Sequence, residues 1–321
     1  MKKKLFVGVD VGGTKIAAAL VSADGTILAR EKLSSPARSN AATFAKTISG
    51  IIEDLLDSKK IKRKNLSGIG VGVPGIVDAK KNKIVMTPNI NLSGFPLAQN
   101  LEQKFGVRVR LGNDVNLGLL GEKWLGAGRK AQNLIGLFPG TGVGGAIIID
   151  GKLYTGHQGV AAELGHMIMD LKGPRCGCGN FGCLEAMTSR WAIERDIRNE
   201  IKKGRRTIIQ KLVKRDLTTI KSKTLREALD KKDPLVTSVI KNASLVLGNA
   251  CVSLNHIFNP EAIILGGGVI EACGEYIIPI IKGTVSSDPF FKKLKTCQIL
   301  PSQLADDAVI LGAVALFKVK K

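Results

Sequence analysis

One pattern occurs twice in this sequence: an apolar strand, a turn rich in glycine and threonine, and a second strand. The first copy joins the expected strands 5–10 and 16–21, and the second joins 134–138 and 146–149, about 130 residues later. A direct return after a short turn is typical of a hairpin, and the helical segments that follow favour an α/β fold. We therefore predict one topology used in two α/β domains, with the two glycine-rich loops facing each other across a cleft.

The rest of the chain alternates between strands and helices. Apolar residues at helical spacing predict helices at 41–56, 96–105, 114–124, 191–203, 234–258, 272–282 and 307–317. Further strands are expected at 27–33, 69–73, 107–111, 262–265 and 298–300. No low-complexity linker separates the halves, so we expect a hinge near 112–118. The predicted domains are a smaller lobe, 1–115, with a C-terminal helix at 305–321 packing back on it, and a larger lobe, 116–304.

Length and cysteine usage suggest a cytoplasmic protein without a membrane partner. The 321 residues suffice for about two domains, and 44% of them are hydrophobic, which is ample for large cores. The apolar run that follows the basic start ends at Asp10, too early for a secretory signal. No stretch approaches the ~20 apolar residues of a membrane span. Cys251, Cys273 and Cys297 are scattered, which suits a reducing compartment better than a disulfide framework.

The chain is strongly basic, with a formal net charge of +21, much of it between residues 195 and 232. Such a region can bind nucleic acid or an acidic surface. However, apolar residues recur at near-helical spacing among the charges, and aromatic residues that could stack on bases are nearly absent. We therefore favour a solvated helical face and consider a nucleic-acid partner unlikely, while a secondary partner for this segment stays open.

A cluster of potential metal ligands lies between residues 163 and 185. Its histidine and three cysteines have the donor set of a closed structural zinc site: His166, Cys176, Cys178 and Cys183. The alternatives are buried free cysteines, or a redox pair with one cysteine left over. Glu163 and Glu185 bracket this segment, and a histidine that binds zinc keeps its other ring nitrogen available. We expect the zinc loop to present these polar groups to a ligand with several hydroxyls.

The glycine-rich segments can hold phosphate groups through backbone N–H groups and a threonine hydroxyl. The candidate residues are Asp10, Gly12, Gly13, Thr14 and Lys15 in the first loop, and Gly140, Thr141, Gly142 and Gly144 in the second. An aspartate in the first position can also hold Mg²⁺. A plain hairpin turn would explain the same glycines. A third set, Gly266, Gly267 and Gly268, permits close approach of an adenosine, or simply begins a helix tightly.

Asp114 follows Asn113 at the expected start of a helix. By default this aspartate would be a helix N-cap. Two short polar residues at the end of a strand also mark the place where ligands bind in open α/β folds. A catalytic role for Asp114 is therefore the second interpretation.

These motifs together resemble the ROK family of sugar kinases and regulators. They follow the family's order over nearly the whole chain, at 10–15, 74–78, 87–91, 112–114, 140–145, 163–166, 176–185 and 265–268. The resemblance implies the two-lobed hexokinase/actin-like fold, an α/β fold of the ribonuclease H-like type with an interdomain cleft. It also implies ATP- and Mg²⁺-dependent phosphorylation of a hexose on its 6-hydroxyl, and the family often forms homodimers.

By motif match, the resemblance makes Asp114 the catalytic base and the four cluster residues the ligands of a structural zinc ion. It also implies a set of sugar-binding residues: Asn89, Asn113, Asp114, Glu163, His166 and Glu185, with backbone help near Gly75. His166 would then serve both the metal and the sugar.

The choice of hexose is left open, because no single residue reads the substituent at carbon 2. The cysteine loop looks more like those of the family's glucokinases, so we expect glucose and a role in glycolysis. N-acetylglucosamine, N-acetylmannosamine and fructose are the alternatives. The family's repressors carry a helix-turn-helix domain ahead of the kinase-like lobes. Only nine residues precede Asp10 here, which favours the kinase class over a sugar-sensing regulator.

Overall fold

The computed structural model describes residues 4–214, 216–294 and 297–318, which divide into two compact units. Unit 1 comprises Met1–Lys130, Gly151–Ala161 and Asp306–Lys321, and unit 2 comprises Ala131–Asp150 and Ala162–Ala305. The basic chain start, position 215 of the basic segment and the end of the expected helix at 305–321 lie outside the described residues. The predicted lobes, 1–115 with 305–321 and 116–304, and the hinge near 112–118 stay predictions.

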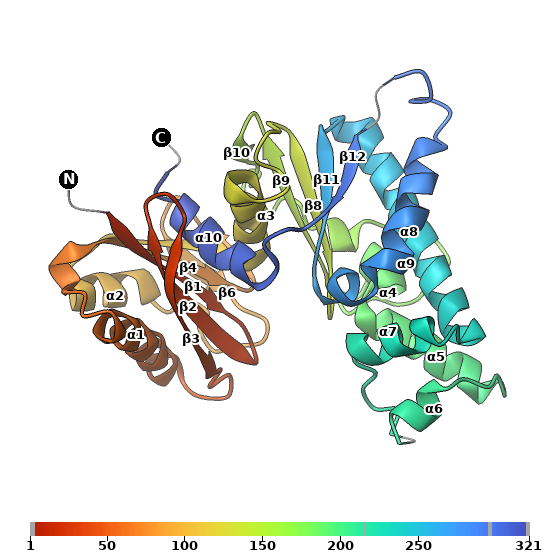
Figure 1. Ribbon diagram of the computed structural model, residues 1–321, viewed down its shortest axis with the longest axis horizontal. Coiled ribbons are helices and arrows are strands. Elements are labelled where there is room, and N and C mark those ends of the chain that lie inside the picture. Colours follow the sequence, from red (N-terminus) through yellow and green to blue (C-terminus); the bar gives the residue numbers. More distant parts are fainter. Residues whose placement is uncertain (1–3, 215, 295–296, 319–321) are drawn as a thin grey trace. The chain divides into compact units, whose positions relative to one another are not determined.

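The core of unit 1 is a five-stranded sheet with the order β3-β2-β1-β4-β7 (Figure 1). Its strands are β1 (Leu5–Val11), β2 (Lys15–Ser22), β3 (Ile27–Ser34), β4 (Leu66–Val73) and β7 (Val109–Asn113). The first three strands pair antiparallel, whereas β1, β4 and β7 pair parallel. The central strands are buried along nearly their whole length, which explains their continuous apolar sequences.

Helices cover both faces of this sheet. They are α1 (Ala41–Ser58), α2 (Leu97–Phe105), α3 (Asp114–Leu125) and α10 (Ala308–Ala315). The branched side chains of β1 and β4 pack with α1 and α2 in one cluster. Several of the alternate positions on these strands are glycines, of which Gly8 and Gly70 face α10. A Cβ on Gly8 would lie 2.3 Å from the Ile310 carbonyl oxygen, and one on Gly70 would lie 2.1 Å from that of Ala313. Only glycine therefore allows α10 to approach so closely.

Unit 2 repeats this topology. Its sheet has the order β10-β9-β8-β11-β12. Unit 2 supplies β8 (Leu134–Pro139), β9 (Val143–Ile149), β11 (Ala262–Leu265) and β12 (Gln298–Pro301), and the two-residue edge strand β10 (Lys152–Leu153) comes from the segment Gly151–Ala161. As in the first sheet, the opening hairpin is antiparallel and the next neighbour, β11, pairs parallel to the first strand. The predicted repeat of strand, glycine-rich turn and strand is therefore confirmed, and so is the α/β class.

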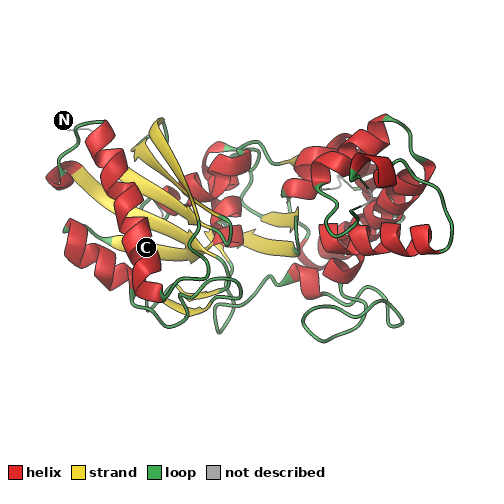
Figure 2. Cartoon of the chain, turned by 90° about the horizontal axis from the view of Figure 1, so that it is seen from below, coloured by secondary structure: helices red, strands yellow, loops and turns green. Residues whose placement is uncertain are grey.

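The helices of unit 2 are α4 (Leu184–Thr188), α5 (Arg190–Lys202), α6 (Ile209–Leu212), α7 (Ser222–Asp230), α8 (Pro234–Phe258) and α9 (Gly268–Ser286). They lie beside the strands in the view of Figure 2. Helix α7 lies where the sequence suggested only a basic connecting segment, and α9 begins four residues before the expected start at 272. The sequence also gave no sign of a short hairpin in unit 1, which consists of β5 (Ile76–Asp78) and β6 (Lys83–Met86).

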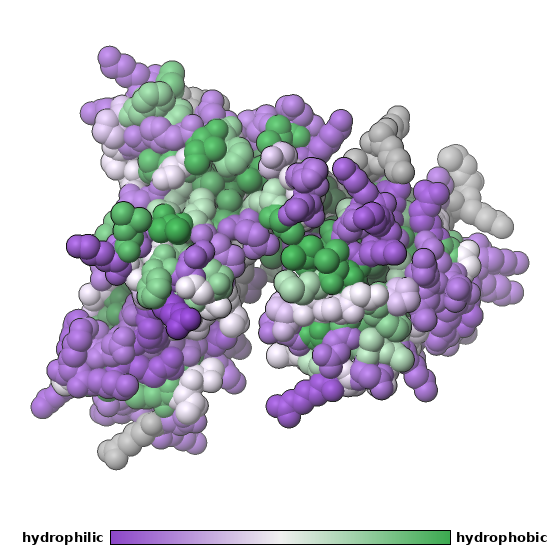
Figure 3. All heavy atoms as spheres, turned by 180° about the vertical axis from the view of Figure 1, so that it is seen from behind, coloured by the Kyte–Doolittle hydropathy of each residue, from purple (hydrophilic) through white to green (hydrophobic). Residues whose placement is uncertain are grey.

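Among the described residues, α8 has the length and composition of a helix that could cross a membrane, contrary to our expectation that no stretch comes close. However, 56% of its most apolar window is buried in the protein, and its apolar residues belong to the core of unit 2. Such burial is typical of a core helix. Hydrophilic side chains cover much of the surface in the view of Figure 3.

Candidate active site and metal centre

In unit 1, the residue that caps α3 is Asn113, not Asp114. The Asn113 side-chain oxygen accepts a hydrogen bond from the Asn116 N–H at 3.0 Å, and Asp114 is the first residue of the helix. Asn113 also donates to the Gly75 carbonyl oxygen at 3.0 Å and to Asp114 Oδ1 at 3.1 Å. The default interpretation of Asp114 as the N-cap is therefore wrong, and its carboxylate is held in place by a neighbour that does the capping.

Asp10 lies near the end of β1 and is electrostatically coupled to Asp114. Burial, and after it the nearby Asp114 carboxylate, raise the pKa of Asp10 to about 7, against the opposing effect of Lys15. A partly buried carboxylate beside another carboxylate gains from a bound cation, since the cation offsets both the burial and the repulsion. This donor chemistry fits the Mg²⁺ that the family resemblance implies for Asp10.

The loop after Asp10 is a tight hairpin turn, in which Gly12 donates to the Lys15 carbonyl oxygen at 2.9 Å. A Cβ on Gly13 would lie 3.7 Å from that of Asn89, so the loop passes beside a predicted sugar-binding residue. Lys15 donates to Asp306 Oδ1 at 3.1 Å. The hairpin and the phosphate-binding interpretations are compatible, and the roles of Thr14 and Lys15 toward phosphate stay predictions.

The backbone geometry at position 75 requires a glycine. Its φ is +95°, and a Cβ there would lie 2.2 Å from the Met86 carbonyl oxygen. Asn89 lines a cavity of about 640 Å³ together with Asn40 and Asn91. Unit 1 therefore places these predicted residues near the ends of successive strands: Asp10 and Gly13 at the end of β1, Gly75 after β4, Asn89 after β6, and Asn113 and Asp114 where β7 meets α3.

In unit 2, the predicted metal ligands meet. One donor atom each from His166, Cys176, Cys178 and Cys183 lies within 4.8 Å of all the others. The sulfurs of Cys178 and Cys183 are 3.7 Å apart, and that of Cys176 is 3.8 Å from His166 Nδ1. A tetrahedral zinc ion with ~2.3 Å bonds to sulfur would separate its sulfur ligands by about 3.8 Å. The donor set and its spacing fit zinc.

Burial disfavours the thiolate form of two thiols of this cluster, Cys176 and Cys183, when no cation is bound. Burial, followed by hydrogen bonding with the other two cysteines, raises the pKa of Cys183 to about 12. All six cysteines are among the described residues, and none forms a disulfide.

The turn that gathers the ligands depends on Gly182, whose φ is +67° and whose Cβ would lie 1.6 Å from the Asp170 carbonyl oxygen.

Glu185 connects the metal loop to the second glycine-rich loop. Its Oε2 accepts from the Val143 N–H at 2.9 Å, and the Cys176 thiol lies 3.7 Å from its Oε1. A Cβ on Gly142 would lie 2.3 Å from the same carboxylate, so the glycine is required for this contact. Glu163 directly precedes the short 3₁₀ helix Leu164–His166, and its backbone carbonyl oxygen accepts from the His166 N–H at 2.9 Å.

The glycine-rich loop also lies against the start of α9. A Cβ on Gly140 would lie 3.9 Å from the Gly268 nitrogen, and one on Gly267 would lie 2.7 Å from the Pro139 carbonyl oxygen. Gly267 has a φ of +80° and immediately precedes the helix. The three glycines 266–268 thus form the tight start of α9. Their role in binding a flat ligand such as adenosine stays a prediction.

Sequence reasoning missed Arg190. It donates from Nη2 to Thr141 Oγ1 at 3.1 Å and from its backbone N–H to the Gly140 carbonyl oxygen at 2.9 Å. The available signal was its spacing of four residues from Glu194, which favours an ion pair on a helix, but the predicted helix, 191–203, began one residue after Arg190.

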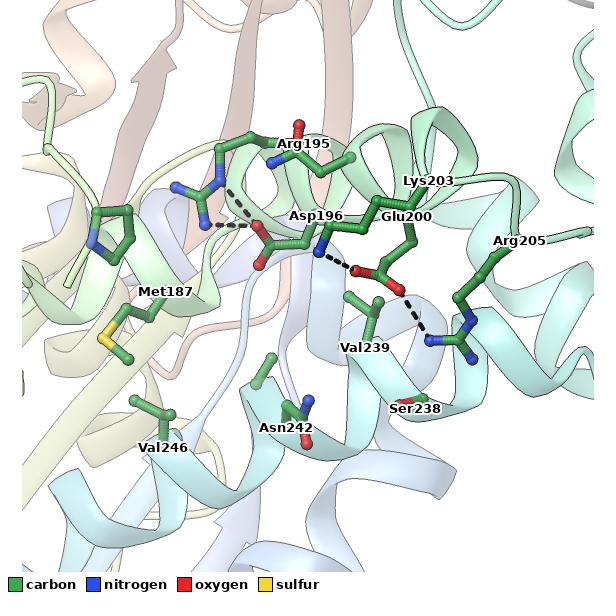
Figure 4. Close-up of a pocket in the computed structure, with 13 residues that line it drawn as sticks. Met187, Arg195, Asp196, Glu200, Lys203, Arg205, Ser238, Val239, Asn242 and Val246 are labelled. Atoms are coloured by element: carbon green, nitrogen blue, oxygen red, sulfur yellow. Dashed lines mark hydrogen bonds and ion pairs between the residues drawn. The ribbon is translucent and has the colours of Figure 1, made fainter.

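The basic segment contributes to a separate cavity of about 580 Å³ between α5 and α8 (Figure 4). No predicted site residue lines it. Its acidic groups are already paired, since Arg195 contacts Asp196, and Glu200 contacts both Lys203 and Arg205. These pairs are consistent with a solvated, charge-rich face.

Two α/β units that repeat one five-stranded topology, one of them with a Cys₃His cluster, define a protein of the two-lobed, actin-like hexokinase class. The family model "ROK family" matches residues 6–320. The chain therefore belongs to the ROK family, and the predicted fold class is confirmed.

Relatives of both functional kinds are similar to this chain. A glucokinase of Thermotoga maritima is 34% identical over 99% of this chain and 98% of its own length. The structure of a ROK family glucokinase from Streptomyces griseus in complex with glucose and AMPPNP is 32% identical, with a TM-score of 0.81 over 97% of this chain and 98% of its own. A DNA-binding transcriptional dual regulator of Escherichia coli is 31% identical over 97% of this chain and 75% of its own length.

Proposed function

We propose that this protein is an ATP-dependent kinase that phosphorylates the 6-hydroxyl of a hexose. The observation that carries the proposal is the arrangement at the start of α3. Asn113 caps the helix, and the neighbouring Asp114 carboxylate, which accepts from the Val115 N–H at 2.9 Å, lies close enough to Asp10 to raise the pKa of that residue. A base beside a carboxylate suited to Mg²⁺ is the pairing that phosphoryl transfer to a hydroxyl requires.

The proposed roles follow from the chemistry. Phosphoryl transfer through a loose transition state needs alignment and charge neutralisation more than covalent chemistry. Mg²⁺ held by Asp10 would neutralise charge on the phosphates. Thr14 and Lys15 of the first loop and Thr141 of the second would bind phosphate oxygens, and the glycines 266–268 would face the adenosine. Asp114 would orient the sugar hydroxyl and accept its proton, a role usually worth ~10²–10⁴-fold in rate.

We propose sugar ligands in each unit. In unit 1 they are the side chains of Asn89, Asn113 and Asp114, with the backbone near Gly75. In unit 2 they are Glu163, His166 and Glu185. Zinc would bind His166 through Nδ1, the ring atom that faces Cys176, which leaves Nε2 for a sugar hydroxyl. Because four protein ligands are available, the zinc ion would be structural and would hold no water or phosphate.

Glucose is the first substrate to test, since two glucokinases are among the relatives at 31–34% identity over nearly full length. N-acetylhexosamines and fructose are the alternatives. The family resemblance further supports a homodimer in the cytoplasm. A coupled assay of ADP release across a panel of hexoses tests the proposal, with glucose expected to give the highest kcat/KM.

A sugar-sensing regulator is the second candidate, because repressors are among the relatives at similar identity. Metal-replete protein without sugar-dependent ADP release, but with sugar-dependent binding to an operator-like DNA fragment, would favour that class. Sugar turnover without specific DNA binding would favour the kinase.

A further inference from the structure

We infer that Arg190 is a positioning residue for the phosphate donor, acting through the hydroxyl of Thr141. The inference rests on the proposed function, because it assigns the loop 140–145 to phosphate binding. Arg190 is the first residue of α5, directly after Ser189, whose side chain caps that helix. It therefore occupies a fixed place where α5 meets the end of β8.

Two hydrogen bonds tie Arg190 to the loop. Its backbone N–H donates to the Gly140 carbonyl oxygen at 2.9 Å, and its guanidinium Nη2 donates to Thr141 Oγ1 at 3.1 Å. The next residues of the loop are held from another side, since Val143 donates to Glu185. The loop is thus fixed on both sides of Gly142, with the exposed Thr141 side chain between the two attachments.

The direction of the Arg190–Thr141 hydrogen bond matters chemically. A guanidinium can only donate, so the Thr141 oxygen accepts and its own O–H is left to donate elsewhere. A hydroxyl oriented in this way suits an anionic oxygen such as that of a phosphate. The arginine also places a permanent positive charge directly behind that hydroxyl, which strengthens its hydrogen bond to an anion.

A buried carboxylate holds the guanidinium in this orientation. Glu194 is 6% exposed, and its Oε1 accepts from Arg190 Nη1 at 2.9 Å. Its Oε2 lies 3.4 Å from Arg198 Nη1. The Glu194 carboxylate therefore binds two arginines, Arg190 one helical turn before it and Arg198 one helical turn after it. Because Arg190 uses different nitrogens for Glu194 and for Thr141, its planar fork sets the angle between the two partners, which a lysine ammonium cannot do.

The same network reaches a second segment near the start of α9. Arg198 also donates to the Leu217 carbonyl oxygen at 2.9 Å. That segment leads into α7. The hydroxyl oxygen of Ser222, the first residue of α7, lies 4.0 Å from the position of a Cβ on Gly268. Through Arg190 and Arg198, Glu194 thus helps to fix two segments that flank the proposed nucleotide site in unit 2.

Calorimetry on the full, metal-replete chain with ATP, ADP and adenosine as probes tests the inference. Arg190→Lys and Thr141→Val should each weaken ATP and ADP binding about tenfold, the loss of one charge-assisted hydrogen bond. Adenosine binding and the KM for sugar should change by less than about twofold, because neither involves the phosphate contact. The double variant should lose about tenfold rather than about a hundredfold, since both changes remove the same interaction.

Two further variants serve as controls. Thr141→Ser keeps the hydroxyl and should retain ATP affinity within about twofold. Arg205→Gln removes another arginine of the same region, one whose partner is Glu200, and should leave all constants unchanged. Thr141 is exposed, so its variants test the inference even if Arg190→Lys fails to fold.

The outcomes separate this inference from the proposed function. Normal ATP affinity in Thr141→Val, multiplicative losses in the double variant, or equal losses for adenosine and ATP would overturn the role of Arg190. A chain that binds ATP with the expected dependence on Arg190 but turns over no hexose would keep this inference and overturn the kinase proposal. Wild-type protein that binds no nucleotide would overturn both.

Discussion

Replacing Asp114 with Asn should separate catalysis from helix capping. The substitution removes the proposed base and keeps the size of the side chain. We expect kcat to fall by ~10²–10⁴-fold, the usual contribution of a general base. That loss corresponds to about 3–5 kcal/mol of transition-state free energy. Sugar affinity should change far less, because the base acts mainly in the transition state.

The same substitution should barely alter the free energy of unfolding. Asp114 is not the N-cap, and a carboxylate in the first turn of a helix contributes only about 0.3–1 kcal/mol through the helix dipole. The Asp114 carboxylate also raises the pKa of Asp10. Removing it relieves that repulsion, which offsets part of the dipole loss. Asn113→Ala is the matched comparison, since it removes the true cap and should cost about 1 kcal/mol of stability.

Steady-state kinetics and urea unfolding of both variants provide the measurement. The account predicts a large loss of kcat with near-normal stability for Asp114→Asn, and a clear loss of stability for Asn113→Ala. Near-normal turnover by Asp114→Asn, or a loss of stability as large as that of Asn113→Ala, would refute the reasoning about both residues.

Three further predictions concern the metal, the basic segment and the packing of α10. Cys178→Ser should lower zinc content and weaken hexose binding roughly tenfold or more, yet leave ATP binding measurable; a zinc-free variant with normal sugar affinity would show that the loop holds itself. Changing Lys211 and Lys214 to Gln should leave the kinase constants alone, and salt-dependent binding to mixed-sequence nucleic acid that disappears in this variant would instead indicate a second function. Gly312→Ala should destabilise the protein by about 1–3 kcal/mol, because its Cβ would lie 1.8 Å from a carbonyl oxygen of α3. The control Gly50→Ala, in α1 with no atom within 4 Å of its Cβ, should instead gain up to ~1 kcal/mol.

Periodicity and motif spacing predicted most of the fold. The paired hairpins and the gathering of the cysteines with His166 both follow from local patterns. Helix α7 was missed because its many charges hide the buried residues Leu225, Ala228 and Leu229. Their spacing of three and four is helical, but a run of only nine residues gives a weak signal.

The errors at the candidate site came from interactions that are distant in sequence or ambiguous by one residue. Asn and Asp are equally good N-caps, so the sequence could not choose between Asn113 and Asp114. Arg190 and Thr141 are 49 positions apart, and no local pattern connects them. The close approach of Gly8 to α10 likewise depends on tertiary packing, which a strand pattern does not encode.

The most direct test of the kinase proposal is ³¹P NMR of the protein mixed with Mg²⁺, ATP and glucose. The account predicts a phosphomonoester signal split by the two methylene protons at carbon 6, together with ADP, and neither product from the Asp114→Asn variant on the same timescale. ADP accompanied only by inorganic phosphate, or no change in the ATP signals with any hexose, would contradict it.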